Sequence, residues 1–351
     1  VRDMCRLYGF RASEATKVEC TLVHAQNALM VQSREDLAGG SHLVTGPLYH
    51  AAPFLFALYH LHNGAALHLM QRFDAEAALQ LIDSHQITHT HWVPTMFMRA
   101  LKLPPQIRSK YSLSSLELVL HGAGPVSVAA KQQMIDWWGP IFTEYWGGTE
   151  SGVCTLCDSA EWQRYPGTVG NALSRFEVFA VGEHGERLLP GQEGMLYARH
   201  KVLAEPFAYY KDAAKTAEAY LQPGVFTLGD YGHVNQQGYV FISSRRSNLI
   251  VSGGVNIYPA EVEAALLKHS VIQDAVVFGL PDEDWGASVN AMVEVPYGEP
   301  IDSDELKDFL IAHLAKFKLP RRVVYVESLG RNPAGKLSLP EARARFAQLV
   351  D

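Results

Sequence analysis

The sequence predicts an α/β protein in which a mostly parallel sheet is followed by a barrel-like antiparallel region and a small α+β domain. Three observations lead to this prediction. Strand-like and helix-like segments alternate between residues 42 and 150, as in parallel sheets. Short strands separated by glycine-containing turns follow from about residue 165, as in antiparallel barrels. Helices and strands then mix again from residue 247 onwards.

Local signals mark the elements of the first region. Asp74 is suited to cap a helix over residues 75–85, and Pro94 is suited to the first turn of another helix. The remaining expected elements are strands at 87–93, 116–120 and 141–145 and a helix at 126–138. Strands that are separated by helices usually pair in parallel, which is why we expect a parallel sheet here.

Later in the chain the expected elements are shorter. In the antiparallel region they are strands at 177–181, 194–198 and 239–243. In the last region they are, in order, a helix at 259–268, strands at 274–279 and 287–295, a helix at 304–315 and a strand at 323–326. We therefore divide the chain into two domains, residues 1–246 and residues 247–351.

The composition is that of a globular protein with more than one core. The chain has 351 residues, of which 48% are hydrophobic and 19% are charged. Its formal net charge of −7 argues against a nucleic-acid-binding protein, which needs a basic face. The most apolar stretch, residues 54–70, is interrupted by polar residues, so we expect no transmembrane segment. The oligomeric state does not follow from the sequence.

The 4 cysteines indicate a reducing compartment rather than a disulfide scaffold. Cys154 and Cys157 form a lone C-x-x-C, and the others, Cys5 and Cys20, are far from it in the chain. No second pair stands at the spacing of a zinc site. We therefore expect no zinc or redox chemistry at this motif and a cytoplasmic location.

The strongest local signal is residues 144–150, which read EYWGGTE and follow a predicted strand. Paired glycines allow a backbone to approach a ligand closely. Thr149 offers a hydroxyl to a phosphate, and Glu150 can hold Mg²⁺. Taken alone, a turn of this kind is more often only a turn.

Four other segments carry residues that are suited to ligand binding or catalysis. Residues 121–125 (HGAGP) also follow a predicted strand, where open α/β sheets bind ligands. Residues 226–230 (FTLGD) place an aspartate after a tight turn, suited to accept hydrogen bonds from a ribose diol. A glycine-rich loop within residues 245–263 leads into a helix. Residues 331–336 (RNPAGK) present Lys336, which taken alone is an ordinary solvated lysine.

Together these five segments resemble, in order and spacing, the adenylate-forming superfamily of acyl-CoA synthetases, luciferases and peptide-synthetase adenylation domains. The resemblance runs from about Val18 to the end of the chain. It implies that residues 1–246 are the remainder of the large AMP-binding domain, a mostly parallel sheet plus a distorted β-barrel, and that residues 247–351 are the small C-terminal domain. The segments most similar to fatty-acyl-CoA ligases are 47–53, 72–74, 93–96 and 281–286.

The resemblance also implies roles for individual residues. Those expected to bind the nucleotide are Gly122, Ala123, Gly124, Pro125, Trp146, Asp230 and Arg245. The aromatic face of Trp146 would stack on the adenine. Thr149 would bind phosphate and Glu150 would bind Mg²⁺. His50 would border the acyl channel, and Gly253 and Gly254 would border the channel for the pantetheine of CoA.

The implied enzyme is an acid–thiol ligase that uses ATP, Mg²⁺ and CoA. A carboxylate attacks the α-phosphate of ATP to give acyl-adenylate and pyrophosphate, and the CoA thiol then displaces AMP. Thr149, Glu150 and Lys336 would be catalytic, because Mg²⁺ on Glu150 and the ammonium of Lys336 offset the charge that develops on the phosphate. The expected partners are CoA and a small-molecule carboxylic acid, which by the resemblance is a fatty acid.

The N-terminal residues depart from the family pattern. Family members have a Thr/Ser/Gly-rich phosphate loop before the histidine that corresponds to His24, whereas residues 11–20 (RASEATKVEC) contain no glycine. The hundred or more residues that usually precede this loop are also missing. Either the chain is incomplete through a frameshift or gene-model error, or it is a degenerate relative that binds or scaffolds without turnover. Whether the chain is active as written does not follow from the sequence. An adenylation domain that loads a carrier protein ranks last, because no carrier domain is attached.

Overall fold

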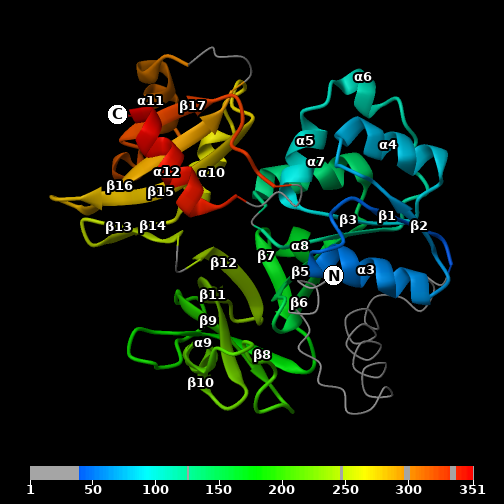
Figure 1. Ribbon diagram of the computed structural model, residues 1–351, viewed down its shortest axis with the longest axis horizontal. Coiled ribbons are helices and arrows are strands. Elements are labelled where there is room, and N and C mark those ends of the chain that lie inside the picture. The colour runs from blue at the N-terminus through cyan, green and yellow to red at the C-terminus, as the bar shows by residue number, and fades with distance from the viewer. Residues whose placement is uncertain (1–38, 125, 246–247, 296–300, 333–336, 351) are drawn as a thin grey trace. The chain divides into compact units, whose positions relative to one another are not determined.

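The computed structural model describes residues 39–124, 126–245, 248–295, 301–332 and 337–350 (Figure 1). These residues form two compact units. One contains the described residues up to Leu228 together with His233–Ile242, and the other contains Gly229–Gly232 and the described residues from Ser243 onwards. The boundary predicted between residues 246 and 247 stays a prediction. The sequence departures at residues 11–20 and His24 lie outside the described residues.

The first unit contains the parallel strands that the alternating pattern predicted. In the described part of the chain the strand order begins β2-β1-β3-β4-β5, and each neighbouring pair is parallel. These strands are β1 (Ser41–Val44), β2 (Ala66–Leu69), β3 (His89–Trp92), β4 (Leu118–His121) and β5 (Phe142–Gly148). The strand order reverses between β1 and β3, and such a reversal opens a crevice at the carboxyl ends of the strands.

Helices cover both faces of this parallel part because its strands are buried on both sides. In β4, Val119 packs into the core on one face, whereas Leu118 and Leu120 pack into the core on the other. The helices are α3 (Ala51–His62), α4 (Ala75–Ser84), α5 (Pro94–Leu101), α6 (Pro105–Arg108) and α7 (Val128–Trp138). Helices α4, α5 and α7 share the core of Val119, and α3 packs on the opposite face (Figure 1).

The helix starts follow local capping chemistry. The side chain of Asp74 accepts a hydrogen bond from the backbone N–H of Ala77, as the sequence predicted, and Pro94 occupies the first turn of α5. Helix α7 begins at Val128 rather than at the predicted residue 126, because Ser127 caps it by accepting from the N–H of Ala130 at 3.2 Å.

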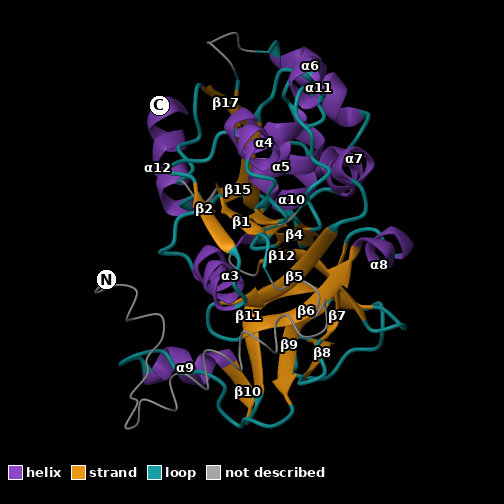
Figure 2. Cartoon of the chain, turned by 90° about the vertical axis from the view of Figure 1, so that its right-hand side faces the viewer, coloured by secondary structure: helices purple, strands orange, loops and turns teal. Residues whose placement is uncertain are grey.

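Antiparallel strands continue the same sheet beyond β5 instead of forming a separate body (Figure 2). The order is β5-β6-β7-β12-β11-β9-β8, with β10 paired to β11. The predicted strands at 177–181, 194–198 and 239–243 are confirmed as β8 (Phe176–Val181), β9 (Gly194–His200) and β12 (Tyr239–Arg245). The sequence analysis missed β6 (Gly152–Asp158), α8 (Ser159–Arg164), β7 (Thr168–Ala172), α9 (Ala213–Ala219), β10 (Tyr220–Gln222) and β11 (Val225–Val234).

The second unit is the predicted small α+β domain. Strand β16 (Gly286–Glu294) pairs antiparallel with β15 (Asp274–Asp282) and parallel with β17 (Arg322–Val326). Side chains alternate between two cores, with Val277 facing one and Val276 and Phe278 facing the other. The remaining elements are the hairpin β13 (Ile250–Ser252) and β14 (Val255–Ile257), the helices α10 (Pro259–Leu266), α11 (Ser303–Ile311) and α12 (Leu339–Val350), and the 3₁₀ turn Lys316–Lys318.

Two expectations for this unit differ from the structure. The helix predicted at 304–315 ends at Ile311, and a 3₁₀ turn follows it. Helix α12 was not predicted, although it buries its own residue Phe346. Across both units, none of the described helices combines the length and apolar character needed to cross a bilayer.

Candidate active site

The segments singled out in the first unit lie at one edge of the sheet. Strands β1, β3, β4 and β5 are parallel, so their carboxyl ends share an edge. His121 is in register with Glu144, which places the turn at residues 122–124 beside residues 145–150. His50 follows β1 at the same edge. Ligands of open α/β sheets bind at this edge, next to the reversal of strand order.

The turn at residues 122–124 is constrained by the strand beside it. A Cβ atom added to Gly122 would lie 2.6 Å from the carbonyl oxygen of Tyr145 and 2.8 Å from its ring, so only glycine fits. Ala123 has a φ of +65°, a left-handed conformation that costs a non-glycine residue about 1 kcal/mol. Gly124 has more space, since its added Cβ would meet nothing nearer than Pro94 at 3.9 Å. Backbone strain of the kind seen at Ala123 is found preferentially at functional sites. Pro125 lies outside the described residues.

A cluster of three buried rings, from Tyr145, His91 and Phe56, packs next to this turn. The hydroxyl of Tyr145 and Nε2 of His91 are 2.9 Å apart, and the ring of Phe56 from α3 stacks on His91 at 5.2 Å. Burial raises the pKa of Tyr145 and lowers the pKa of His91 to about 4, so both side chains are neutral at pH 7. The turn therefore rests on a neutral hydrogen bond between β3 and β5.

The turn at residues 147–150 is built around two glycines. The β5–β6 ladder shifts register between Trp146 and Gly147. At this irregularity an added Cβ on Gly147 would lie 2.1 Å from the carbonyl oxygen of Gly152. The N–H of Gly148 donates to Ser151 Oγ at 3.3 Å, which closes the turn. Gly147 is thus required by the backbone of β6, whereas a Cβ on Gly148 would meet only the side chains of Glu150 and Leu228.

Gly147→Ala is expected to destabilise the first unit by about 1–3 kcal/mol, because the methyl group has no space and the ladder must move. Urea unfolding measures the change. Gly124→Ala is the matched control, since its methyl group meets only Pro94, and it should change stability by less than about 0.5 kcal/mol. Equal stabilities for the Gly147→Ala variant and the unmodified chain would contradict the packing argument.

Trp146 and Thr149 differ in exposure. Trp146 is 6% exposed and packs in the core with Tyr145 and Val153. Thr149 is exposed at the tip of the turn. The stacking of Trp146 on adenine and the phosphate contact of Thr149 remain predictions.

Glu150 is half-buried, and residues distant in the chain determine its orientation. Its Oε1 accepts a hydrogen bond from the hydroxyl of Tyr209 at 2.9 Å. Its Oε2 faces the turn, where a Cβ on Gly148 would lie 2.9 Å away. Burial, and to a lesser degree Glu150, raise the pKa of Tyr209 to about 12, so the phenol stays protonated and donates. The sequence analysis missed Tyr209, because nothing local marks it.

The donor set at this turn is compatible with Mg²⁺. Among the described residues, no three His, Cys, Asp or Glu side chains converge as they do in a protein cage for a metal ion. Mg²⁺ bound together with substrate phosphates needs only one or two carboxylates from the protein. Glu150 alone therefore suffices as the protein ligand, at the edge where the nucleotide is expected.

A buried ion pair lies beneath the candidate site, and the sequence analysis missed it too. Nζ of Lys131 in α7 donates to Oε2 of Glu144 at 2.5 Å, and it lies 4.8 Å from the centroid of the Trp162 ring. Nε2 of His121 is 3.8 Å from the same carboxylate oxygen. Burial, and secondarily the Lys131 charge, lower the pKa of His121 well below its usual value, so it stays neutral. The pair joins α7 to the first residue of the 144–150 segment.

His50 stands at the N-cap of α3, with its side chain making no capping hydrogen bond. It is half-buried, and its ring lies 4.6 Å from the ring of Tyr49, which is 54% exposed. Two aromatic side chains thus border the start of α3 at the carboxyl end of β1. A role for His50 in an acyl channel remains a prediction.

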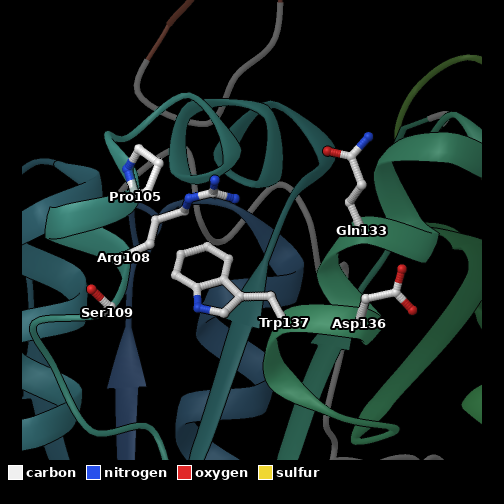
Figure 3. A pocket seen from close by; sticks show the side chains of 6 residues that line it. All are labelled: Pro105, Arg108, Ser109, Gln133, Asp136 and Trp137. Atoms are coloured by element: carbon white, nitrogen blue, oxygen red, sulfur yellow. The ribbon is translucent and has the colours of Figure 1, made fainter.

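A surface pocket of about 480 Å³ lies away from this edge (Figure 3). It is lined by Pro105, Arg108, Ser109, Gln133, Asp136 and Trp137. The guanidinium of Arg108 lies 5.5 Å from the centroid of the Trp137 ring. Gln133, Asp136 and Trp137 lie in the second half of α7, and Pro105, Arg108 and Ser109 lie in or next to α6, which precedes β4 and therefore lies towards the amino edge of the sheet. The pocket is therefore separate from the candidate site.

In the second unit, the predicted glycine pair forms a tight hairpin. Gly253 and Gly254 connect β13 and β14 with φ values of +57° and +78°, the signature of a two-residue turn that favours glycine. A Cβ on Gly253 would lie 2.6 Å from the ring of Trp285. The role of this glycine pair towards CoA stays a prediction.

The two residues expected to bind the ribose are Asp230 and Arg245. Asp230 is 4% exposed, and the side chain of Arg245 lies outside the described residues. Their role towards the ribose stays a prediction.

Lys336 lies outside the described residues, but the residue that opens its segment is firmly held. Arg331 donates from Nε to Asp274 at 2.5 Å and from Nη2 to the second carboxylate oxygen at 2.9 Å. Such a two-point pair fixes direction as well as distance. Nearby, burial raises the pKa of Glu263 to about 7 while its carboxylate accepts from the N–H of Val277. The segment that carries Lys336 therefore starts from a fixed point on β15.

Two family models match the chain. The AMP-binding enzyme model matches residues 20–207, and the model of the AMP-binding enzyme C-terminal domain matches residues 261–336. A feruloyl-CoA synthase from an Amycolatopsis species is 33% identical over 351 residues, covering 98% of this chain and 70% of the relative. A 3-[(3aS,4S,7aS)-7a-methyl-1,5-dioxo-octahydro-1H-inden-4-yl]propanoyl:CoA ligase from Rhodococcus jostii is 34% identical over 304 residues, covering 85% of this chain and 56% of the relative.

Solved structures agree with these matches. ATP-bound MatB from Rhodopseudomonas palustris superimposes with a TM-score of 0.81 and 26% identity, covering 94% of this chain and 65% of that one. The amide bond synthetase McbA from Marinactinospora thermotolerans gives a TM-score of 0.79 and 25% identity, covering 93% and 66%. The chain thus spans between about half and two thirds of the length of several proteins that it matches. It belongs to the adenylate-forming AMP-binding enzyme family, and its relatives in that family include CoA ligases.

Proposed function

We propose that the protein is an ATP-dependent acid–thiol ligase, which activates a carboxylic acid as its acyl-adenylate and transfers the acyl group to CoA. The observation that carries this proposal is the juxtaposition of two turns at one sheet edge. The strained turn at 122–124 and the glycine turn that ends in Glu150 are neighbours through the pairing of β4 with β5. A nucleotide bound against the first turn would present its phosphates to the second.

Each residue would perform a physical task in this reaction. The exposed hydroxyl of Thr149 would donate to a phosphate oxygen, and Glu150 would hold Mg²⁺. When bound, Mg²⁺ would offset the negative charge that develops on the α-phosphate. The ammonium of Lys336 would stabilise the same charge, and Asp230 and Arg245 would bind the ribose. CoA thiolysis would then release AMP.

The acid substrate is best proposed as a hydrophobic acid that contains a ring. Relatives include a feruloyl-CoA synthase, a 2-succinylbenzoate–CoA ligase and an indoleacetate–CoA ligase. The aromatic pair at the start of α3, Tyr49 and His50, would suit such a ring. A fatty acid is the second candidate, favoured by the likeness of residues 47–53 to fatty-acyl-CoA ligases and by a fatty acid–acyl-carrier-protein ligase among the relatives.

The test is AMP release from ATP with a panel of acids, each with and without CoA. Ferulate, 2-succinylbenzoate, indoleacetate and fatty acids of several lengths distinguish the two substrate classes. CoA-dependent AMP formation with one class supports the proposal and selects the substrate. A folded protein that binds ATP but turns over no acid would instead support the non-catalytic alternative.

Glu150→Gln is expected to lower kcat by about 100-fold, because an uncharged amide holds the cation poorly while the size of the side chain is kept. Excess Mg²⁺ should restore part of the loss. Glu183→Gln, on an exposed turn, is the matched control and should keep full activity. Full activity of the Glu150→Gln variant would exclude the role assigned to Glu150.

Lys336→Ala should abolish adenylation while ATP still binds.

A further inference from the structure

We propose that Tyr209 is a positioning residue that orients the carboxylate of Glu150 toward a divalent cation. This inference rests on the proposed function, because it concerns the same cation site. The hydroxyl of Tyr209 donates to Glu150 Oε1 at 2.9 Å across 59 residues of sequence. A partner that holds a metal ligand in place commonly matters about as much as the ligand itself.

The geometry leaves the second carboxylate oxygen facing the glycine turn. The hydrogen bond from Tyr209 engages Oε1, and Oε2 lies where a Cβ on Gly148 would be 2.9 Å away. Oε2 therefore points over the turn next to Thr149, on the side where phosphates are expected. Without the phenol, the carboxylate of Glu150 could rotate about its terminal torsions, which have broad minima.

Tyr209 itself is held in place by the start of α9. Its backbone N–H donates to Thr216 Oγ1 at 2.9 Å, and that hydroxyl donates to the carbonyl oxygen of Asp212. The ammonium of Lys215 lies 4.0 Å from the centroid of the Tyr209 ring, and the ring of Phe207 meets it edge-on at 5.7 Å. Hydrogen bonds at the start of α9 therefore hold the backbone of Tyr209, and contacts with Lys215 and Phe207 hold its ring.

The chemistry of the partner favours a positioning role over charge neutralisation. A phenol is an uncharged donor, so it orients a carboxylate without cancelling the negative charge that binds a cation. A lysine at this position would compete with the cation directly. Lys215 is close to the site but lies over the ring of Tyr209, where it contacts the π face. The arrangement therefore directs the carboxylate of Glu150 without placing a positive charge on it.

The experiment compares Tyr209→Phe with Tyr210→Phe in the whole chain. Tyr209→Phe removes only the donating hydroxyl. Tyr210 is 73% exposed and is the neighbouring tyrosine, so its phenylalanine variant is a matched control. Mn²⁺ replaces Mg²⁺ as a paramagnetic probe, and electron paramagnetic resonance measures Mn²⁺ affinity in the presence of ATP. ATP affinity is measured separately with EDTA, and circular dichroism checks folding.

We expect Tyr209→Phe to weaken Mn²⁺ binding about 10-fold, with ATP affinity in EDTA unchanged, and Tyr210→Phe to match the unmodified chain. In a Glu150→Gln background, Tyr209→Phe should have no further effect. An unchanged Mn²⁺ affinity, or an equal loss in both backgrounds, would overturn the inference, because the phenol would then be irrelevant or merely structural. If the unmodified chain takes up no Mn²⁺ with ATP, the proposed function itself fails and the inference falls with it.

Discussion

Acidification from pH 7.5 to pH 5 is expected to lower the free energy of unfolding of the first unit, by about 2 kcal/mol through His91 alone. His42, His91 and His121 are 0%, 3% and 0% exposed, and burial lowers the pKa of each below its usual value. His91 would contribute about 2 kcal/mol at pH 5, since the unfolded chain binds a proton there and the fold does not. His42 and His121 act in the same direction and add to this loss.

The direction of this change in stability follows from the lowered pKa values of the three histidines. Because the folded pKa lies below 6.5, stability is fully present above pH 6.5 and is lost as the pH falls towards about 4, the folded pKa of His91. The side chains around these histidines either increase this loss of stability at low pH or do not change it. His42 stacks on His60 at 4.1 Å, so protonating both would create repulsion. His60 in turn lies 4.7 Å from the ring of His89.

The other neighbours are neutral or already paired. Tyr145 faces His91, and its phenol remains protonated. Glu144 faces His121 at 3.8 Å, but that carboxylate already accepts from Lys131 at 2.5 Å, and the charge of Lys131 opposes protonation of His121. In this environment no described neighbour would keep these imidazoles protonated in the fold.

Urea unfolding at pH 7.5 and pH 5 measures the difference. His42→Leu should reduce the pH-dependent loss of stability, because one buried titrating group is removed. His184→Asn, at an exposed turn, should leave the loss unchanged. Unfolding midpoints that coincide at the two pH values would contradict the prediction.

Lys131→Met is expected to destabilise the first unit by about 3–5 kcal/mol. The lysine is fully buried and donates to Glu144 Oε2 at 2.5 Å. Removing one partner of a buried ion pair leaves the other charge without compensation. Burial already raises the pKa of Glu144, and because Lys131 opposes this shift, loss of Lys131 would raise the pKa further.

The double variant Lys131→Met, Glu144→Leu is the control for this prediction. It replaces both charges with apolar groups, which should recover most of the lost stability, since buried pairs often contribute little net energy compared with good apolar packing. Thermal or urea unfolding of the single and double variants gives the comparison. A single variant as stable as the unmodified chain would show that Glu144 does not depend on Lys131.

Much of the fold follows from signals that are local in sequence. Asp74 caps α4 and Pro94 opens α5 as predicted, because both effects act within one helical turn. The alternation of strands and helices similarly predicts the parallel sheet. Strands between 150 and 175 and between 220 and 235 were missed, since their apolar residues are interrupted by polar ones and do not stand out from the turns around them.

The sequence by itself also predicted that the segments containing Gly122 and Gly148 follow strands, and the structure pairs those two strands in parallel. Only the tertiary structure decided how those turns are held. Gly122 is required by Tyr145, Lys131 by Glu144, and Glu150 is directed by Tyr209, 59 residues away. Such pairings depend on strand register and on burial, which no local pattern encodes, because they arise only when distant segments pack together.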